Sequence, residues 1–210
     1  MVLLSAFLTR LMPHVKGCPE PLAQQALVDA AIEFCETTQL IQETLTPIDV
    51  TAGVGSYDLT PESRSEISRV VRVTYDGYRL GALATLDGVY QLEYTAKPVY
   101  FYTDVVDEQM VLQLYPAPDE TKTDALSVRA AVRPRRDATS LPTLLYERWV
   151  DAMVDGALAR LYGTADQLFT DEAKAVVCAQ KFRHKMTVAR IEAARGQSVN
   201  NLTVVQRPFA

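Results

Sequence analysis

Helix-forming sequence lies on both sides of about ninety residues that alternate like short strands, and this order constrains the fold more than any single motif. In the flanking segments apolar residues recur every three or four positions, which predicts amphipathic helices. In the middle, β-branched residues cluster between turn signals, which predicts strands. We therefore expect an α+β fold, in which a helical bundle is interrupted by a central antiparallel β insert and followed by an extended C-terminal arm.

The flanking segments predict four helices. They cover residues 3–12, 21–43, 142–162 and about 171–195. Pro21 suits a first helical turn because its missing N–H would have no partner there, and Thr170 is a suitable N-cap for the last helix. Gly163 follows the third helix and is expected to end it.

Four residues of these helices are expected in the core or at an interface, namely Phe34, Trp149, Gly156 and Phe182. Each lies on the apolar stripe of its helix. Glycine in the middle of a helix costs around 1 kcal/mol relative to alanine, so Gly156 suggests that another backbone approaches the helix closely at this point.

About seven short strands are expected in the insert. Asp76-Gly77 is a strong signal for a tight hairpin turn, and Gly53-Val54-Gly55 is predicted to connect a second hairpin. Further strands are expected from Val89 to Tyr94 and from Tyr100 onward. Short strands at this spacing indicate an antiparallel sheet or a small sandwich.

The chain divides into four segments. Residues 1–43 form the N-terminal helices, 44–135 the β insert, 136–196 the C-terminal helices and 197–210 the extended arm. The arm has no helical period. It could add a strand to another sheet or be a frayed terminus.

Charge is distributed unevenly along this chain, whose net charge is −5. Residues 47–125 carry thirteen acids and six bases, whereas residues 171–210 carry three acids and seven bases. These regions are either two solvated faces or two surfaces for different neighbours, because opposite fields favour oriented docking. The net negative charge argues against general affinity for nucleic acid, which depends on phosphate neutralisation by Lys and Arg.

No residue cluster indicates catalysis, and we predict no catalytic, cofactor-binding or metal-ligating residue. His14 and His184 are far apart in the sequence and lack metal-ligand spacing. Asp104, Asp107 and Glu108 could do acid–base chemistry only at a defined distance across a substrate, so a solvated loop is the simpler interpretation.

Two further groups have more than one interpretation. Arg133, Arg135 and Arg136 form either a hinge with solvated charges or a contact for nucleic acid or an acidic neighbour. The insert is also rich in aromatic side chains, which suit the core of a sheet or a protein interface. They are Tyr90, Tyr94, Tyr100, Phe101, Tyr102 and Tyr115.

The cysteines and the N-terminus indicate a reduced, cytosolic origin. The three cysteines are too few and too scattered for a disulfide framework or a zinc site, and Cys35 and Cys178 are expected to be buried thiols. The apolar N-terminus lacks a preceding basic residue and is too short to span a membrane, so no membrane partner is expected.

Several stretches of the chain resemble the head-to-tail adaptor proteins of tailed bacteriophages. These stretches are residues 17–22 through 34–38, 112–118, 133–142, 145–159 with Trp149, 193–196 and 207–209. The resemblance extends over nearly the whole chain in its order of elements, and the motifs that carry it are packing and turn motifs.

The resemblance implies a structural virion protein, made in the host cytoplasm and located in the neck between head and tail. Such adaptors form a ring, usually a dodecamer, beneath the portal protein. The ring extends the DNA channel, meets the passing genomic DNA without sequence specificity and offers a platform to tail or nozzle proteins.

Carried over to this chain, the resemblance implies that residues 197–210 are the portal-binding arm. Its contact residues would be Val204, Val205, Arg207, Pro208 and Phe209. Residues 44–135 would face the tail or adjacent subunits. Two alternatives stay open, namely a different interaction module such as a tail-completion protein, a stopper or a host regulator, and a hydrolase that uses carboxylates of the insert.

Overall fold

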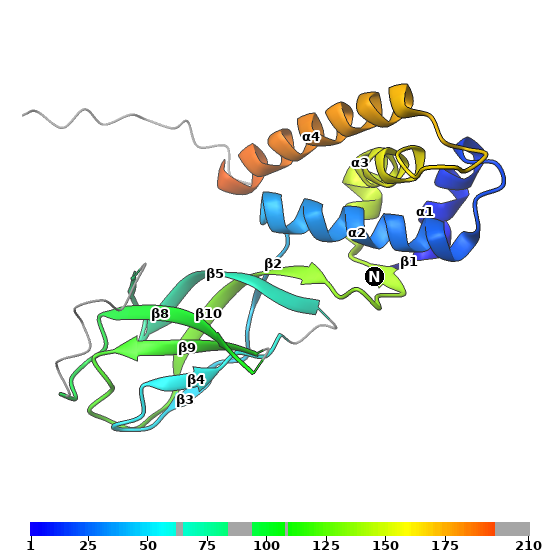
Figure 1. Ribbon diagram of the computed structural model, residues 1–210. Coiled ribbons are helices and arrows are strands. Elements are labelled where there is room, and N and C mark those ends of the chain that lie inside the picture. Colours follow the sequence, from blue (N-terminus) through cyan, green and yellow to red (C-terminus); the bar gives the residue numbers. More distant parts are fainter. Residues whose placement is uncertain (62–64, 84–93, 108, 196–210) are drawn as a thin grey trace, which may run out of the picture.

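The computed structural model describes residues 1–61, 65–83, 94–107 and 109–195. It consists of a helical part and a β part, which meet where α2 approaches β10 (Figure 1). The helices are α1 (Leu4–Leu11), the short 3-10 helix η1 (Met12–His14), α2 (Glu20–Thr38), α3 (Thr143–Tyr162) and α4 (Glu172–Arg195). The expectation of a mixed α+β fold is therefore confirmed.

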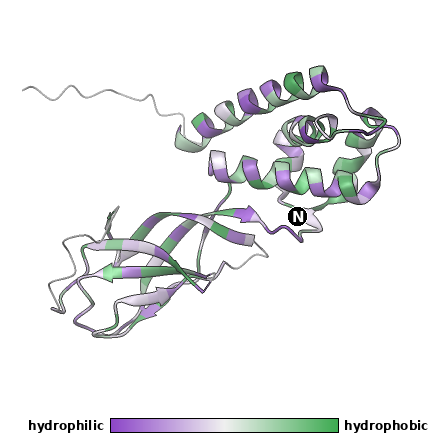
Figure 2. Ribbon diagram, in the orientation of Figure 1, coloured by the Kyte–Doolittle hydropathy of each residue, from purple (hydrophilic) through white to green (hydrophobic). Residues whose placement is uncertain are grey.

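The helical part has its own hydrophobic core. Helix α3 lies in the middle and contacts α1, α2 and α4. Hydrophobic residues alternate with hydrophilic ones along these helices (Figure 2), and the hydrophobic faces turn toward one another. The largest fully buried side chains of this core are Phe7, Leu11, Leu27, Phe34, Leu145, Met153 and Leu161.

The β part contains two sheets. One has the order β2 (Gln42–Thr44), β10 (Lys122–Pro134), β5 (Ser65–Tyr75) and β6 (Tyr78–Arg79), and β3 (Ile48–Val50) also pairs with β10. The other has the order β4 (Ser56–Asp58), β9 (Gln109–Tyr115), β8 (Tyr100–Val106) and β7 (Gly81–Ala82). Apart from the parallel pair β7–β8, the pairings in both sheets are antiparallel.

Side chains from both sheets form a second core, in which Val73 and Leu126 of one sheet accompany Leu112 of the other. The small sandwich suggested by the strand spacing is thus confirmed. A separate two-stranded sheet pairs β1 (Val2–Leu3) with β11 (Ser140–Leu141), which ties the N-terminus to the segment before α3.

The first long helix is shorter than predicted. Helix α2 ends at Thr38, whose hydroxyl donates to the Phe34 carbonyl at 2.7 Å, and Gln39 then takes a left-handed conformation with φ of 51°. The prediction that the helix continues to Glu43 was wrong, because residues 42–44 pair instead with β10. A strand partner far away in the sequence outweighs the local helical pattern here.

One of the two predicted hairpins is confirmed and the other is wrong. Asp76 and Gly77 have φ of 49° and 78° and join the antiparallel strands β5 and β6, as a two-residue hairpin turn requires. Gly53 and Gly55 do not connect a hairpin, because β3 pairs with β10 whereas β4 pairs with β9. The glycine segment crosses from one sheet to the other. The strand predicted from residue 89 lies outside the described residues except for its last residue.

Residues next to the helix termini determine where α3 ends and where α4 begins. Helix α3 ends at Gly163, as predicted. The N-cap predicted at Thr170 was wrong, because the Asp171 carboxylate accepts the backbone N–H of Lys174 at 3.0 Å while the Thr170 hydroxyl donates to the Thr164 carbonyl. The hydrogen bond from the Lys174 ammonium also lowers the pKa of Asp171.

Candidate interaction surfaces

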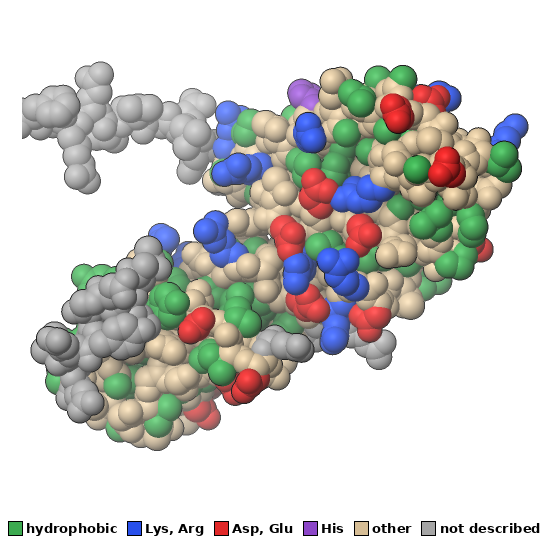
Figure 3. All heavy atoms as spheres, in the orientation of Figure 1, with side chains coloured by type: hydrophobic (Ala, Val, Ile, Leu, Met, Phe, Trp, Pro, Cys, Tyr) green, Lys and Arg blue, Asp and Glu red, His purple; other side chains and the backbone are tan. Residues whose placement is uncertain are grey.

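Carboxylates of α2 meet arginines from other parts of the chain at the junction of the helical part and the β part. Helix α2 contains four acidic residues and no Lys or Arg. Figure 3 shows red and blue side chains gathered where the two parts meet. Two pairs form there, Asp29–Arg136 and Glu36–Arg133, and a third, Glu33–Arg160, joins α2 to α3 within the helical part.

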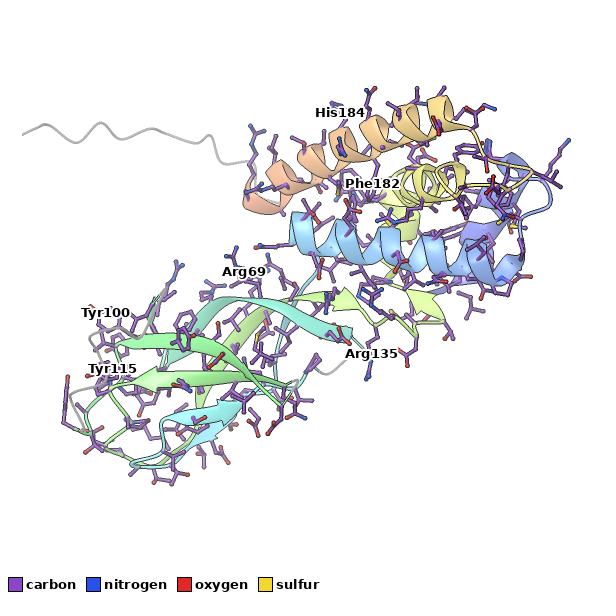
Figure 4. The ribbon with its side chains drawn as sticks, in the orientation of Figure 1. Arg69, Tyr100, Tyr115, Arg135, Phe182 and His184 are labelled. Atoms are coloured by element: carbon purple, nitrogen blue, oxygen red, sulfur yellow. The ribbon has the colours of Figure 1, made fainter. Side chains whose placement is uncertain are left out.

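Arg133 links the two parts through a single guanidinium group. It extends from β10 and contacts Glu36 of α2 and, at 2.9 Å, Glu66 of β5. Arg135, at the end of β10 nearest the helices (Figure 4), lies 3.6 Å from Asp137 and 3.9 Å from Glu66. The acidic groups that these arginines meet therefore belong to the same chain.

Phe34, Gly156 and Phe182 meet at the centre of the helical part. The Phe34 ring is fully buried, and its centroid lies 6.3 Å from that of Phe182. A Cβ atom on Gly156 would lie 2.9 Å from the Cβ of Ala30 and from the Phe182 ring. Gly156 is thus required by side chains of α2 and α4, which corrects the expectation that another backbone approaches it.

Trp149 occupies an irregular position in α3. Its φ of −125° and ψ of 16° lie outside the helical range, so the helix is kinked there. The indole is partly buried and lies 5.5 Å from the Phe34 ring, between ring centroids. Its Nε1–H is buried and has no acceptor in the part of the chain that the structure describes.

We expect Trp149→Ala to lower the free energy of unfolding by about 2 kcal/mol, less than for a fully buried aromatic residue. Trp149→Phe should cost far less, because it keeps the contact with Phe34 and removes an N–H whose burial without a partner is unfavourable. Urea unfolding followed by circular dichroism measures both. Equal costs for the two substitutions would mean that the indole N–H has a partner in solution.

The end of the β part far from the helices carries exposed aromatic side chains. Tyr78, Tyr94 and Tyr100 are largely exposed, and the Lys97 ammonium lies 3.6 Å from the centroid of the Tyr78 ring. Tyr100 and Tyr115 are labelled at this end in Figure 4. Phe101, by contrast, is buried in the sandwich. The described members of the predicted aromatic set are therefore divided between core and surface, and Tyr90 lies outside the described residues.

The two candidate acid–base residues that the structure describes, Asp104 and Asp107, do not line a common cavity. The Asp104 carboxylate accepts the N–H of the next residue at 2.8 Å, Asp107 lies in the turn after β8, and Glu108 lies outside the described residues. His184 projects outward from α4 (Figure 4). Within the described ranges, no three His, Cys, Asp or Glu side chains are grouped so that they could hold a metal ion.

The thiols are not activated either. All three cysteines are buried, as expected for Cys35 and Cys178. Burial raises the pKa of Cys18 and Cys178 and raises that of Cys35 to about 12. A nucleophilic cysteine requires a lowered pKa, so these side chains are packing residues.

The sequence matches the SU10 adaptor protein family over residues 3–206. The chain belongs to this family. The match covers the helical part and the β part of the SU10 adaptor protein together, and it agrees with the resemblance to phage head-to-tail adaptors. A comparison with curated proteins finds no match.

Membership of the SU10 adaptor family makes the chain a structural phage adaptor. The residues predicted for the portal-binding arm, from Val204 to Phe209, lie outside the described residues. In the described parts of this adaptor, no helix is both long and apolar enough to span a bilayer.

Sequence reasoning missed the role of the α2 carboxylates. The available signal was a helix of nineteen residues with four acids and no base, which has to meet cations elsewhere or remain solvated. It could not indicate which arginines pair with these carboxylates, because the arginines lie about 100 residues or more further along the chain.

Proposed function

We propose that this SU10 adaptor protein is the head-to-tail adaptor of a tailed phage and forms a ring beneath the portal. The observation that supports the proposal is the family match over residues 3–206, which includes every described helix and strand from α1 onward. The ring would be a dodecamer in the neck of the virion, and its subunits would be made in the host cytoplasm.

The two parts of the chain would serve different neighbours. The helical part would form the body of the ring, and residues 44–135 would face tail or nozzle proteins or the adjacent subunit. The arm, residues 197–210, would bind the portal through Val204, Val205, Arg207, Pro208 and Phe209. Helix α4 ends at Arg195, which is exposed, so the arm would start at the surface of the helical part.

The ring would extend the DNA channel without gripping the DNA. Tight binding to a duplex requires many Lys and Arg contacts with phosphates. With a net charge of −5, this chain has more acids than bases, and four of its arginines are already paired with carboxylates of the same chain. Genomic DNA would therefore pass without sequence-specific contacts.

The proposal predicts that this protein co-sediments with the portal ring encoded by the same genome. Native mass spectrometry should show one adaptor copy per portal subunit, which measures the role and the stoichiometry together. The portal ring alone and the adaptor alone are the controls. An adaptor that stays separate from the portal but binds purified tail components would instead be a stopper or tail-completion protein.

A further inference from the structure

Helix α4 carries two pairs of exposed apolar side chains on the side that faces away from the molecule, with exposed His184 between them. Its inner face packs into the helical core through Cys178, Phe182, Met186 and Ala189. Its outer side presents four β-branched residues, Val176, Val177, Val188 and Ile191, whose exposed fractions lie between 45% and 57%. Because β-branched residues are weaker helix formers than Ala, Lys or Glu, helix stability does not account for them.

A groove continues this outer face at the start of α4. It has a volume of about 800 Å³ and runs between α3 and α4. Buried Val154, Leu158 and Tyr162 of α3 line it together with charged side chains, and Val177 of α4 belongs both to the groove and to the outer face. The charged lining residues are Asp151, Asp155, Lys174, Lys181 and Lys185. An exposed apolar patch that continues into a groove is typical of a protein contact.

Cations flank the outer face. Lys181, Arg183, Arg190 and Arg195 are exposed and form no ion pair within the described residues. Figure 3 shows hydrophobic and Lys or Arg side chains together along the upper edge of the molecule, over α4. A partner that covers the valines therefore also meets four positive charges.

These charges identify the kind of partner. Helix α4 has six Lys or Arg and two Glu, a net charge of +4, whereas the whole chain carries −5, so the rest of the chain carries −9. Two α4 faces placed against each other would bring like charges together. The α4 face of one copy against another surface of the next copy brings opposite charges together, which favours association.

We propose that the outer face of α4, defined by Val176, Val177, Val188 and Ile191, is the surface on which a second copy of this chain docks through a surface other than its own α4. Such a head-to-tail contact generates a ring when the rotation between copies closes. The inference rests on the proposed ring and adds the surface and the polarity of the contact.

The first test places a photo-cross-linking amino acid at position 177, both in concentrated protein alone and in protein mixed with the portal ring. The expected product joins position 177 of one copy to a peptide outside α4 of another copy. A product that joins α4 to α4 would contradict the head-to-tail contact, and a product with the portal would contradict the second copy as the partner.

The second test compares Val177→Asp/Ile191→Asp with the control Leu3→Asp/Leu168→Asp, which changes two exposed leucines outside both α4 and residues 44–135. The portal ring is mixed with half as many adaptor copies as it has subunits and is analysed by native mass spectrometry. For wild type and control, we expect portal rings that carry either no adaptor or a complete adaptor ring, because neighbouring adaptor copies stabilise one another. The α4 variant should still attach but give partly filled rings, since each copy then binds independently.

Each other outcome is informative. The inference would be contradicted if the α4 variant still gave only empty and complete adaptor rings on the portal. It would also be contradicted if the variant no longer attached to the portal. Both results would leave the proposed function intact. If wild type fails to attach to the portal, the proposed function fails. The cross-link in protein alone then decides whether α4 contacts a second copy.

Discussion

Removing residues 197–210 is expected to abolish attachment of this protein to the portal ring and to leave the described fold intact. The buried residues of the helical core lie between Leu4 and Ala189, so the deletion removes none of them. A nonperiodic segment that starts at an exposed helix end can bind as an extended strand or arm without contributing to the fold. Co-sedimentation with the portal measures the first effect, and thermal unfolding followed by circular dichroism measures the second.

A variant with residues 197–210 in scrambled order is the matched control, because it keeps the length and charge of the arm. If the arm recognises the portal through Val204, Val205, Arg207, Pro208 and Phe209, the scrambled variant should fail as the deletion does. Attachment of the truncated protein at wild-type level would refute the assignment of the arm.

Phe34→Ala is expected to lower the free energy of unfolding by about 3–5 kcal/mol, the cost of removing a fully buried aromatic side chain. The ring of Phe34 on α2 contacts Trp149 of α3 and Phe182 of α4. Because a Cβ on Gly156 would already clash with Ala30, α2 and α3 are closely packed beside this ring, and we expect the cavity to close only in part. Trp149 is the single tryptophan of the chain, and its fluorescence in a urea titration reports unfolding of the helical part.

Leu168→Ala is the control for this experiment, because Leu168 is 96% exposed and the substitution should change stability by no more than about 0.5 kcal/mol. Combining Phe34→Ala with Phe182→Ala should cost less than the sum of the two single changes, since they share one contact. A cost for Phe34→Ala below about 1 kcal/mol would mean that the three helices do not pack around this ring.

Local signals predicted most of the helices and one hairpin. Gly163 ends α3 and Asp76-Gly77 joins β5 to β6 because a few neighbouring residues determine each feature. The end of α2 was not predictable in this way. Residues 42–44 continue a helical pattern, and only pairing with residues 129–131 of β10 makes them a strand. The crossing at Gly53 depends in the same way on strands that lie more than fifty residues later.

The interaction surfaces were harder to predict than the fold. Periodicity identified the inner stripe of α4, including Phe182, because buried positions repeat every three or four residues. The exposed valines on the other side of α4 carry no such signal, since only the structure shows which face remains uncovered. The partners of Arg133 were equally hidden, because Glu36 and Glu66 lie in two different elements far from it in the sequence.

Strand β10 gives the molecule a mechanical property. Its first half places Leu126 and Val128 in the sandwich core. Its second half buries Ala131 and Val132, and the Val132 N–H donates to the carbonyl of Ile41, which follows α2. This strand of thirteen residues is thus held at one end by the sandwich and at the other end by the segment next to the helices. Because β10 also contacts α2, and α2 packs against α3 and α4, a force applied to the sandwich would be transmitted through this strand to the helical part.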